Sequence, residues 1–154
     1  MKYYFNAIDI KAVFNTTISN GSEIYLQLPD KKDSVEVNLN DMNGRKRDLY
    51  APKYAARDFN FNCVTEGDDM EDFQKNYFGI WQLVKKAERI PVFNDHYNLT
   101  LNLYYEKQTN LSPMYSTSNG GYAVSYTLQF SETNPIDNIP IVELVDDLYN
   151  VLVP

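Results

Sequence analysis

Strict alternation of apolar and polar residues predicts three half-buried antiparallel strands. The clearest alternation runs over residues 122–131, where every second side chain is a large apolar residue. Residues 97–106 follow the same period of two, and residues 57–64 place Phe59, Phe61 and Cys63 on one face. A period of two is typical of a strand with one face on the core and the other in water. We therefore expect a domain built mainly on antiparallel sheet.

Three Asn-Gly pairs separate the strand-like segments, at residues 20–21, 43–44 and 119–120. Asn-Gly favours the type I′ turn, whose twist matches that of two antiparallel strands. Each pair is therefore expected to close a hairpin. The strand-like neighbours are residues 10–19 and 22–28 for the first pair, and residues 111–117 and 122–131 for the third. Asn94-Asp95 is expected to turn the chain between residues 90–93 and 97–106.

Residues 69–88 are predicted to form one long helix. Apolar residues recur there at steps of three and four, at Met70, Phe73, Tyr77, Ile80, Trp81 and Val84. Asp68 is expected to cap the helix with Glu71 completing the box, and basic residues at the other end suit the helix dipole. A helix of this length is a rod of roughly 30 Å, enough to cross a sheet and cover its apolar face. Gly79 inside the helix indicates a close backbone approach.

The chain changes character near residue 135, which divides a β domain at residues 1–135 from an apolar C-terminal arm at residues 136–154. The arm carries a row of apolar residues at helical spacing: Ile141, Leu144, Leu148 and Leu152. Burying each such side chain contributes about 1.5–3 kcal/mol, so the arm is expected to be ordered against something. It either packs as a short helix on its own core or docks on a neighbouring subunit. We expect it to contribute to assembly.

Composition narrows the function classes. The 154 residues suit one domain, and a net charge of −7 opposes sequence-independent binding of nucleic acid. The single cysteine, Cys63, cannot form an internal disulfide, and the single histidine, His96, cannot build a His-rich metal site. Without a signal-peptide pattern or an apolar run long enough to span a bilayer, the expectation is a soluble protein of a reducing compartment.

Candidate chemistry is sparse, and we expect no enzyme, cofactor or metal site. The acidic run at residues 67–72 lacks the ligand spacing of a calcium loop, and acids are normal at a helix start. No nucleophile elbow accompanies His96, and Cys63 reads as a core residue. Arg45, Lys46 and Arg47, beside an Asn-Gly turn, form either a solvated loop or a contact for phosphate or an acidic surface.

The order of elements resembles a known family. The motifs that carry the resemblance, in chain order, are residues 4–10, Asn43-Gly44-Arg45 with Asp48, Tyr54-Ala55-Ala56-Arg57-Asp58-Phe59, the capped helix, Tyr104-Tyr105-Glu106 and residues 128–135. Together they resemble the N-terminal domain of the distal tail proteins of long-tailed bacteriophages, within the wider phage tail-tube-like fold. The resemblance covers about residues 4–135. It implies a mainly-β (α+β) fold: an antiparallel β-sandwich or open barrel, with one long helix packed across a sheet.

The family implies a structural, non-catalytic subunit of a phage tail or tail-like particle. Such subunits form a ring, commonly of six copies, around the DNA channel, as the distal hub, tube, terminator or connector. The expected partners are further copies and neighbouring tail proteins, with DNA passing through an acidic lumen without specific binding. The expected location is the virion tail, after assembly in the cytoplasm of the bacterial host.

Two surfaces are candidates for the contact between subunits. Local charge complementarity would pair the basic residues Arg45, Lys46 and Arg47 with the acidic helix start of the next subunit, at Asp68, Asp69 and Asp72. The apolar row of the arm is the second candidate surface. The alternative function is a non-catalytic β-sandwich binding module that presents some of its 13 tyrosines to a glycan or a protein.

Overall fold

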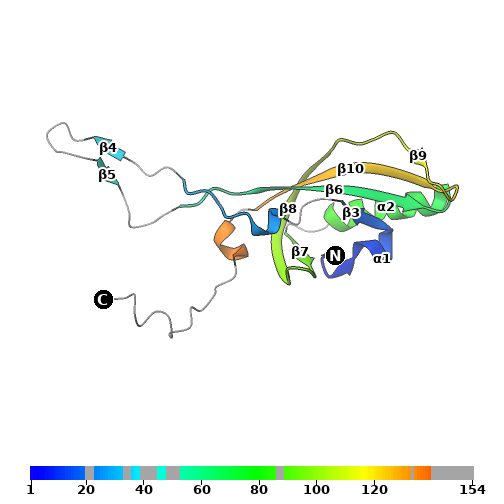
Figure 1. Ribbon diagram of the computed structural model, residues 1–154, viewed down its shortest axis with the longest axis horizontal. Coiled ribbons are helices and arrows are strands. Elements are labelled where there is room, and N and C mark those ends of the chain that lie inside the picture. The colour runs from blue at the N-terminus through cyan, green and yellow to red at the C-terminus, as the bar shows by residue number, and fades with distance from the viewer. Residues whose placement is uncertain are drawn as a thin grey trace.

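The computed structural model is mostly antiparallel sheet with one main helix, which confirms the expected mainly-β α+β class (Figure 1). The structure describes residues 1–19, 23–32, 36–38, 45–47, 53–85, 89–132 and 134–139. The elements in chain order are β1 (Tyr3–Phe5), β2 (Ile8–Asp9), α1 (Ile10–Phe14), β3 (Thr16–Ile18), the 3₁₀ turn η1 (Glu23–Leu26), β4 (Glu36–Asn38), β5 (Arg45–Arg47), β6 (Asp58–Gly67), α2 (Met70–Lys85), β7 (Ile90–Asn94), β8 (Leu99–Thr109), β9 (Tyr115–Ser116), β10 (Tyr122–Ser131) and the 3₁₀ turn η2 (Pro135–Asn138).

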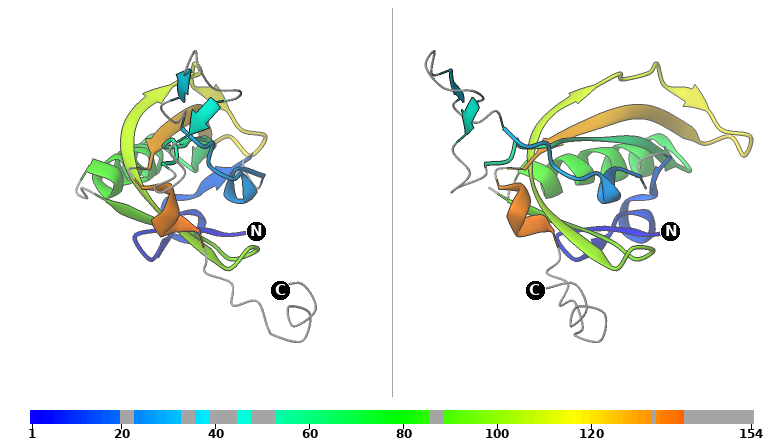
Figure 2. Two further views of the ribbon diagram at one scale, coloured as in Figure 1. Left: turned by 90° about the vertical axis from the view of Figure 1, so that its left-hand side faces the viewer. Right: turned by 60° about the vertical axis from the view of Figure 1, so that its left-hand side comes forward.

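Strand β8 joins the two halves of one open, eight-stranded sheet. The strand order is β2-β1-β7-β8-β10-β6-β3, with β9 paired to β10, and every pair is antiparallel. Residues 99–103 of β8 pair with β7, whereas residues 104–109 pair with β10. Figure 2 shows β8 sweeping in a long curve from the β7 side to the β10 side. The curved sheet therefore encloses the core on its concave face.

The core consists largely of the residues that the alternating pattern predicted. Phe59, Phe61 and Cys63 of β6 are all buried, as are the alternate residues of β10 from Val124 to Phe130. Phe61 meets Phe130 edge on, with ring centroids 5.6 Å apart. Edge-to-face packing of this kind adds to the stabilisation that the buried area supplies. The three strands predicted from periodicity are thus confirmed as β6, β8 and β10.

Helix α2 lies across β6 and β10, as the sequence predicted, but the structure begins it one residue later, at Met70. The predicted cap is also one residue off. The Asp69 Oδ1 atom accepts a hydrogen bond from the Asp72 backbone N–H at 2.7 Å, and Asp72 Oδ2 accepts one from the Asp68 N–H at 3.1 Å. Asp69 thus caps the helix through Asp72, and Asp72 reaches back to the N–H of Asp68, one residue before the cap, in place of the box that was expected of Asp68 and Glu71.

Gly79 of α2 lies against helix α1, where a Cβ atom would overlap the ring of Phe14. The close approach inferred from this glycine is therefore that of a side chain rather than of a backbone. Within the described residues, no helix is both long and apolar enough to cross a membrane.

Three segments predicted as strands fold differently, in whole or in part. Residues 10–14 form α1, because the Asp9 carboxylate accepts hydrogen bonds from the N–H groups of Lys11 and Ala12, both at 3.0 Å. Asn15 ends that helix in the left-handed region, with φ of 43°. Residues 23–26 form the 3₁₀ turn η1, and only Tyr115–Ser116 of the expected strand at residues 111–117 pairs as β9.

The hairpin at Asn119-Gly120 exists, but its turn is not type I′. A type I′ turn needs positive φ at both central residues. Of this pair only Gly120 has it, at 84°. The Gly120 N–H donates to the Thr117 carbonyl at 3.0 Å, and the Thr117 N–H donates to the Gly121 carbonyl at 2.9 Å. The turn is thus a three-residue loop that closes on a left-handed glycine. The other two Asn-Gly pairs lie outside the described residues.

Candidate assembly surfaces

A network of buried charged and polar side chains at the edge of the core connects several segments of the chain. The Arg57 and Glu132 side chains are 5% and 0% exposed and form a two-pronged ion pair, in which Nη2 donates to Oε2 at 2.8 Å. Arg57 Nη1 also donates to the Gln27 carbonyl. Asn138 Nδ2 donates to Glu132 Oε2 at 2.7 Å, and Asn138 Oδ1 accepts from the Asn102 N–H at 2.8 Å. We call these five residues the junction network.

The junction network ties together segments that are far apart in the sequence. Gln27 and Arg57 bracket the excursion that carries β4 and β5, and Asn138 lies in η2, near the start of the C-terminal arm at residues 136–154. Removing one partner of a buried ion pair leaves an uncompensated charge, so the pair is expected to hold these segments in place. The network thereby fixes where the β4–β5 excursion departs from the core and where Asn138 is attached to it.

The ion pair between Arg57 and Glu132 was not predicted, although the alternating pattern of the two strands indicates it. Phe130 faces Phe59 across the β6–β10 ladder, and the Glu132 N–H bonds the Arg57 carbonyl at 3.2 Å. Arg57 and Glu132 therefore continue the inward-facing rows of the two strands, each two residues beyond a buried phenylalanine. Opposite charges on buried positions of paired strands predict an ion pair. Both residues also lie in motifs that carry the family resemblance, Arg57 in residues 54–59 and Glu132 in residues 128–135.

The basic residues Arg45, Lys46 and Arg47 form strand β5, not a loop. This strand pairs with β4 in a two-stranded ribbon, with Glu36 opposite Arg47 and Asn38 opposite Arg45. Nearer the core, the same excursion is held by hydrogen bonds from the Lys32 N–H to the Lys53 carbonyl at 2.8 Å and from the Ala55 N–H to the Asp30 carbonyl at 2.7 Å. Figure 1 shows the ribbon at one end of the molecule, away from the main sheet.

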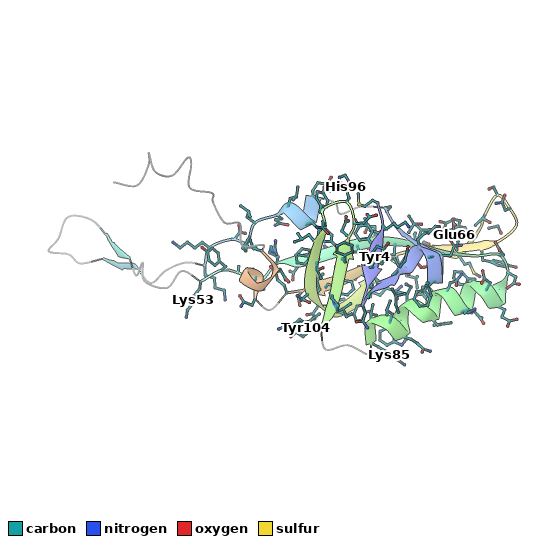
Figure 3. All side chains as sticks on the ribbon, turned by 90° about the horizontal axis from the view of Figure 1, so that it is seen from below. Tyr4, Lys53, Glu66, Lys85, His96 and Tyr104 are labelled. Atoms are coloured by element: carbon teal, nitrogen blue, oxygen red, sulfur yellow. The ribbon has the colours of Figure 1, made fainter. Side chains whose placement is uncertain are left out.

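The acidic helix start lies at the opposite end of the molecule. In Figure 3, Glu66 marks that end, Lys85 at the other end of α2 lies near the middle, and Lys53 marks the side of the ribbon. Asp68 and Asp69 are exposed, and Asp72 is half-buried. The structure therefore does not bring the acidic and basic candidates together within one subunit. The arm candidates Ile141, Leu144, Leu148 and Leu152 lie outside the described residues.

Cys63, His96 and three of the tyrosines lie in surroundings that are typical of structural residues. Burial raises the pKa of the Cys63 thiol to about 12, so this cysteine stays protonated at neutral pH. His96 is exposed and packs edge on against Tyr97, with ring centroids 4.9 Å apart. Tyr3, Tyr25 and Tyr126 belong to the core. In the part of the chain that the structure describes, no group of three acidic, histidine or cysteine side chains is placed to hold a metal ion.

Aromatic side chains also line an open groove between α2 and β8, with a volume of about 240 Å³. Trp81 of α2 meets Tyr105 of β8 edge on, with ring centroids 5.7 Å apart. Gln108 Nε2 donates to the Tyr77 hydroxyl at 2.8 Å across the same groove. Several aromatic rings thus gather there in a concave, partly exposed setting. The groove is therefore a third candidate surface, which the sequence reading did not single out.

Comparison with known proteins identifies the fold. No protein-family model matches the chain, and no curated protein sequence matches it either. The chain is similar to the crystal structure of SPP1 Dit (gp 19.1), described as a paradigm of the hub adsorption apparatus in phages that infect Gram-positive bacteria. The match has a TM-score of 0.57 at 15% sequence identity and covers 87% of this chain. This chain spans about half of the Dit chain, 50%. The predicted resemblance to a distal tail protein is thereby confirmed at the level of fold.

Proposed function

We propose that the chain is a structural subunit of a bacteriophage tail or tail-like particle. The observation that carries the proposal is the fold shared with SPP1 Dit over 87% of the chain. Fold alone does not determine function, so the proposal also rests on what the surface offers for assembly. In this account the protein has no catalytic role. It acts in the virion tail after assembly in the host cytoplasm, and its partners are further copies of itself and neighbouring tail proteins.

The placement of charge supports a head-to-tail contact between copies. The basic ribbon and the acidic helix start lie at opposite ends of the molecule, so each can meet its complement only on another copy. A contact between two different surfaces closes into a ring when the rotation between copies allows it. We propose a ring of six copies in which Arg45, Lys46 and Arg47 face the helix start at Asp68, Asp69 and Asp72 of the next copy.

The acidic character of the subunit suits a ring around DNA. Clustered lysines and arginines hold DNA by displacing its counterions. A net charge of −7 in every copy works against such binding. DNA would then pass through the ring without specific contacts.

Charge reversal tests this contact. Replacing Arg45, Lys46 and Arg47 with Glu is expected to abolish assembly of the full chain, because like charges would meet across the interface. Adding Asp68→Lys should then restore part of the assembly, since it re-creates an attractive pair without removing the Asp69–Asp72 cap. Glu71→Lys on the same helix is the matched control for added positive charge. Unchanged assembly in the triple variant, measured by native mass spectrometry, would remove the ribbon from the interface.

The alternative function, a tyrosine-presenting binding module, draws its support from the groove between α2 and β8. The groove is concave and lined by aromatic rings, which glycans use for stacking. Among its lining residues the polar groups are the Gln108 amide, the tyrosine hydroxyls and the Trp81 indole N–H, and Gln108 already bonds Tyr77. Sugars need several free polar partners, whereas apolar side chains need none. The groove therefore suits a protein segment better than a sugar.

A further inference from the structure

Helix α2 has one flank that nothing in the described structure covers. One side of the helix packs on the sheet through Phe73, Ile80 and Val84, and Gly79 packs against Phe14 of α1. The third flank carries Met70, Gln74, Phe78, Trp81 and Lys85, which recur at helical steps of three and four.

The uncovered flank is unusually apolar for a surface. Phe78 is 54% exposed and Trp81 is 47% exposed. Large aromatic side chains gathered on a surface mark interaction sites more often than chance. The flank forms one wall of the groove, with Tyr105 of β8 opposite and Leu128 of β10 below. This surface therefore suits the packing of an apolar helix.

The chain itself contains a segment with matching chemistry. In residues 140–154 the row Ile141, Leu144, Leu148 and Leu152 has the spacing of one helical face. As a helix this row would extend about 17 Å, and the flank from Met70 to Lys85 extends about 22 Å. The two lengths are compatible along one line of contact. Asp146 and Asp147 in the segment also complement Lys85 on the flank.

The starting point of the segment allows it to leave its own subunit. Asn138 is held on β8 through the backbone of Asn102, in the junction network. Sixteen residues follow it, and as a helix residues 140–154 would extend about 22 Å, the length of the flank. In a ring, the flank of a neighbouring copy is available to every segment.

We propose that residues 140–154 of one copy dock as a helix in the groove between α2 and β8 of the next copy. This inference rests on the proposed ring, since it needs a second copy of the chain. It assigns the groove an occupant and the C-terminal arm a destination. Each subunit then donates one arm and accepts another, which is the arrangement that a head-to-tail contact requires.

Trp81 is the chain's only tryptophan and lies in the acceptor groove, so its fluorescence reports docking directly. The full chain is diluted across the range in which oligomers dissociate, followed by native mass spectrometry. The emission maximum is expected to move to shorter wavelength as oligomers form, because the docked arm removes water from the indole. An emission maximum that does not change with concentration would overturn the inference, since docking within one copy is independent of concentration.

Two full-length variants separate donor from acceptor. Leu148→Asp places a charge in the apolar row of the arm. Phe78→Glu places a charge in the groove, at an exposed position that does not contribute to the core. Each is expected to raise the concentration for half-assembly at least about tenfold, the cost of one lost apolar contact. Glu143→Gln on the arm, outside its apolar row, and Gln82→Glu on α2, outside the groove lining, are the controls, and they should assemble normally.

Mixing the two variants gives the sharpest result. The mixture contains one kind of intact arm and one kind of intact groove, so arm exchange is expected to form a one-to-one heterodimer at concentrations where neither variant associates alone. Absence of the heterodimer would contradict arm exchange. Closed rings of the wild type with an unresponsive Trp81 would leave the proposed function standing and overturn this inference alone. Arm exchange without closed rings would support this inference and contradict the proposed closed ring.

Discussion

The hydroxyl of Tyr25 is the most informative single group in the core. It is buried, and within the described residues it has no hydrogen-bond partner. Burial raises the pKa of Tyr25, and the neighbouring Tyr3 adds to the effect. Burial also raises the pKa of Tyr126, whose hydroxyl instead contacts the Thr65 hydroxyl at 2.8 Å. The two tyrosines form a matched pair that differs in hydrogen bonding.

Tyr25→Phe is expected to keep or raise the free energy of unfolding at pH 7, because it removes an unpaired buried polar group. Tyr126→Phe is expected to lower it by about 1 kcal/mol, the usual net value of one hydrogen bond. Urea unfolding of both variants beside the wild type measures the difference. A larger loss for Tyr25→Phe than for Tyr126→Phe would mean that the Tyr25 hydroxyl is bonded in the native protein.

The same groups predict how stability depends on alkaline pH. Their pKa values are higher in the folded chain than in the unfolded chain, so the folded state holds these protons more tightly. Their contribution is complete below pH of about 9–10, where the unfolded groups begin to titrate. It falls above that pH by about 1.4 kcal/mol per pH unit for each group. Tyr25→Phe should make the fall between pH 10 and 11 less steep, as urea midpoints at the two pH values will show.

Arg57 and Glu132 are expected to depend on one another. Replacing either by an uncharged residue, as in Arg57→Met or Glu132→Gln, should cost about 3–5 kcal/mol because the remaining charge is buried and unpaired. The double variant Arg57→Met/Glu132→Gln should cost clearly less than the sum of the two single losses. A double-mutant cycle in urea measures the coupling, for which we expect at least about 2 kcal/mol. Additive losses would show that the two charges do not interact.

At the scale of elements, long periodic segments were predictable and short ones were not. Residues 122–131 and most of the apolar face of α2 repeat their pattern over several pleats or turns, so burial and pattern agree there, whereas Met70 and Trp81 of the predicted helix face are exposed. Helix α1 has only five residues, too few for a helical period, and it exists because Asp9 caps it and Phe14 packs on Gly79. Such tertiary support is invisible to a local reading. The junction network was likewise missed because its partners lie 75 residues apart.

The cap of α2 provides a test at this scale. Asp69→Ala should lower the free energy of unfolding by about 1 kcal/mol, because the Asp72 N–H then loses its acceptor. Asp68→Ala should cost less, since only the backbone of Asp68 takes part in the box. Thermal unfolding of the two variants distinguishes the positions. A greater loss for Asp68→Ala would return the cap to the residue that the sequence pattern favoured.

At the scale of the whole molecule, the β4–β5 ribbon favours assembly as the function. The ribbon lies away from the main sheet, and the buried charges of the junction network fix the base of its excursion. A monomer gains nothing from holding such an extension at a defined place, whereas a subunit that must reach neighbouring copies does. The sequence predicted the positive charge of the ribbon, but the buried base of its excursion became visible only in the fold.

The central claim is that copies of this chain join head to tail and close into a ring. The most direct measurement is native mass spectrometry of the full chain over a wide concentration range, with negative-stain electron microscopy of the same samples. The account predicts a single closed species, most simply six copies, that appears as a ring in micrographs. Monomers alone at high concentration, or dimers that do not grow further, would contradict it.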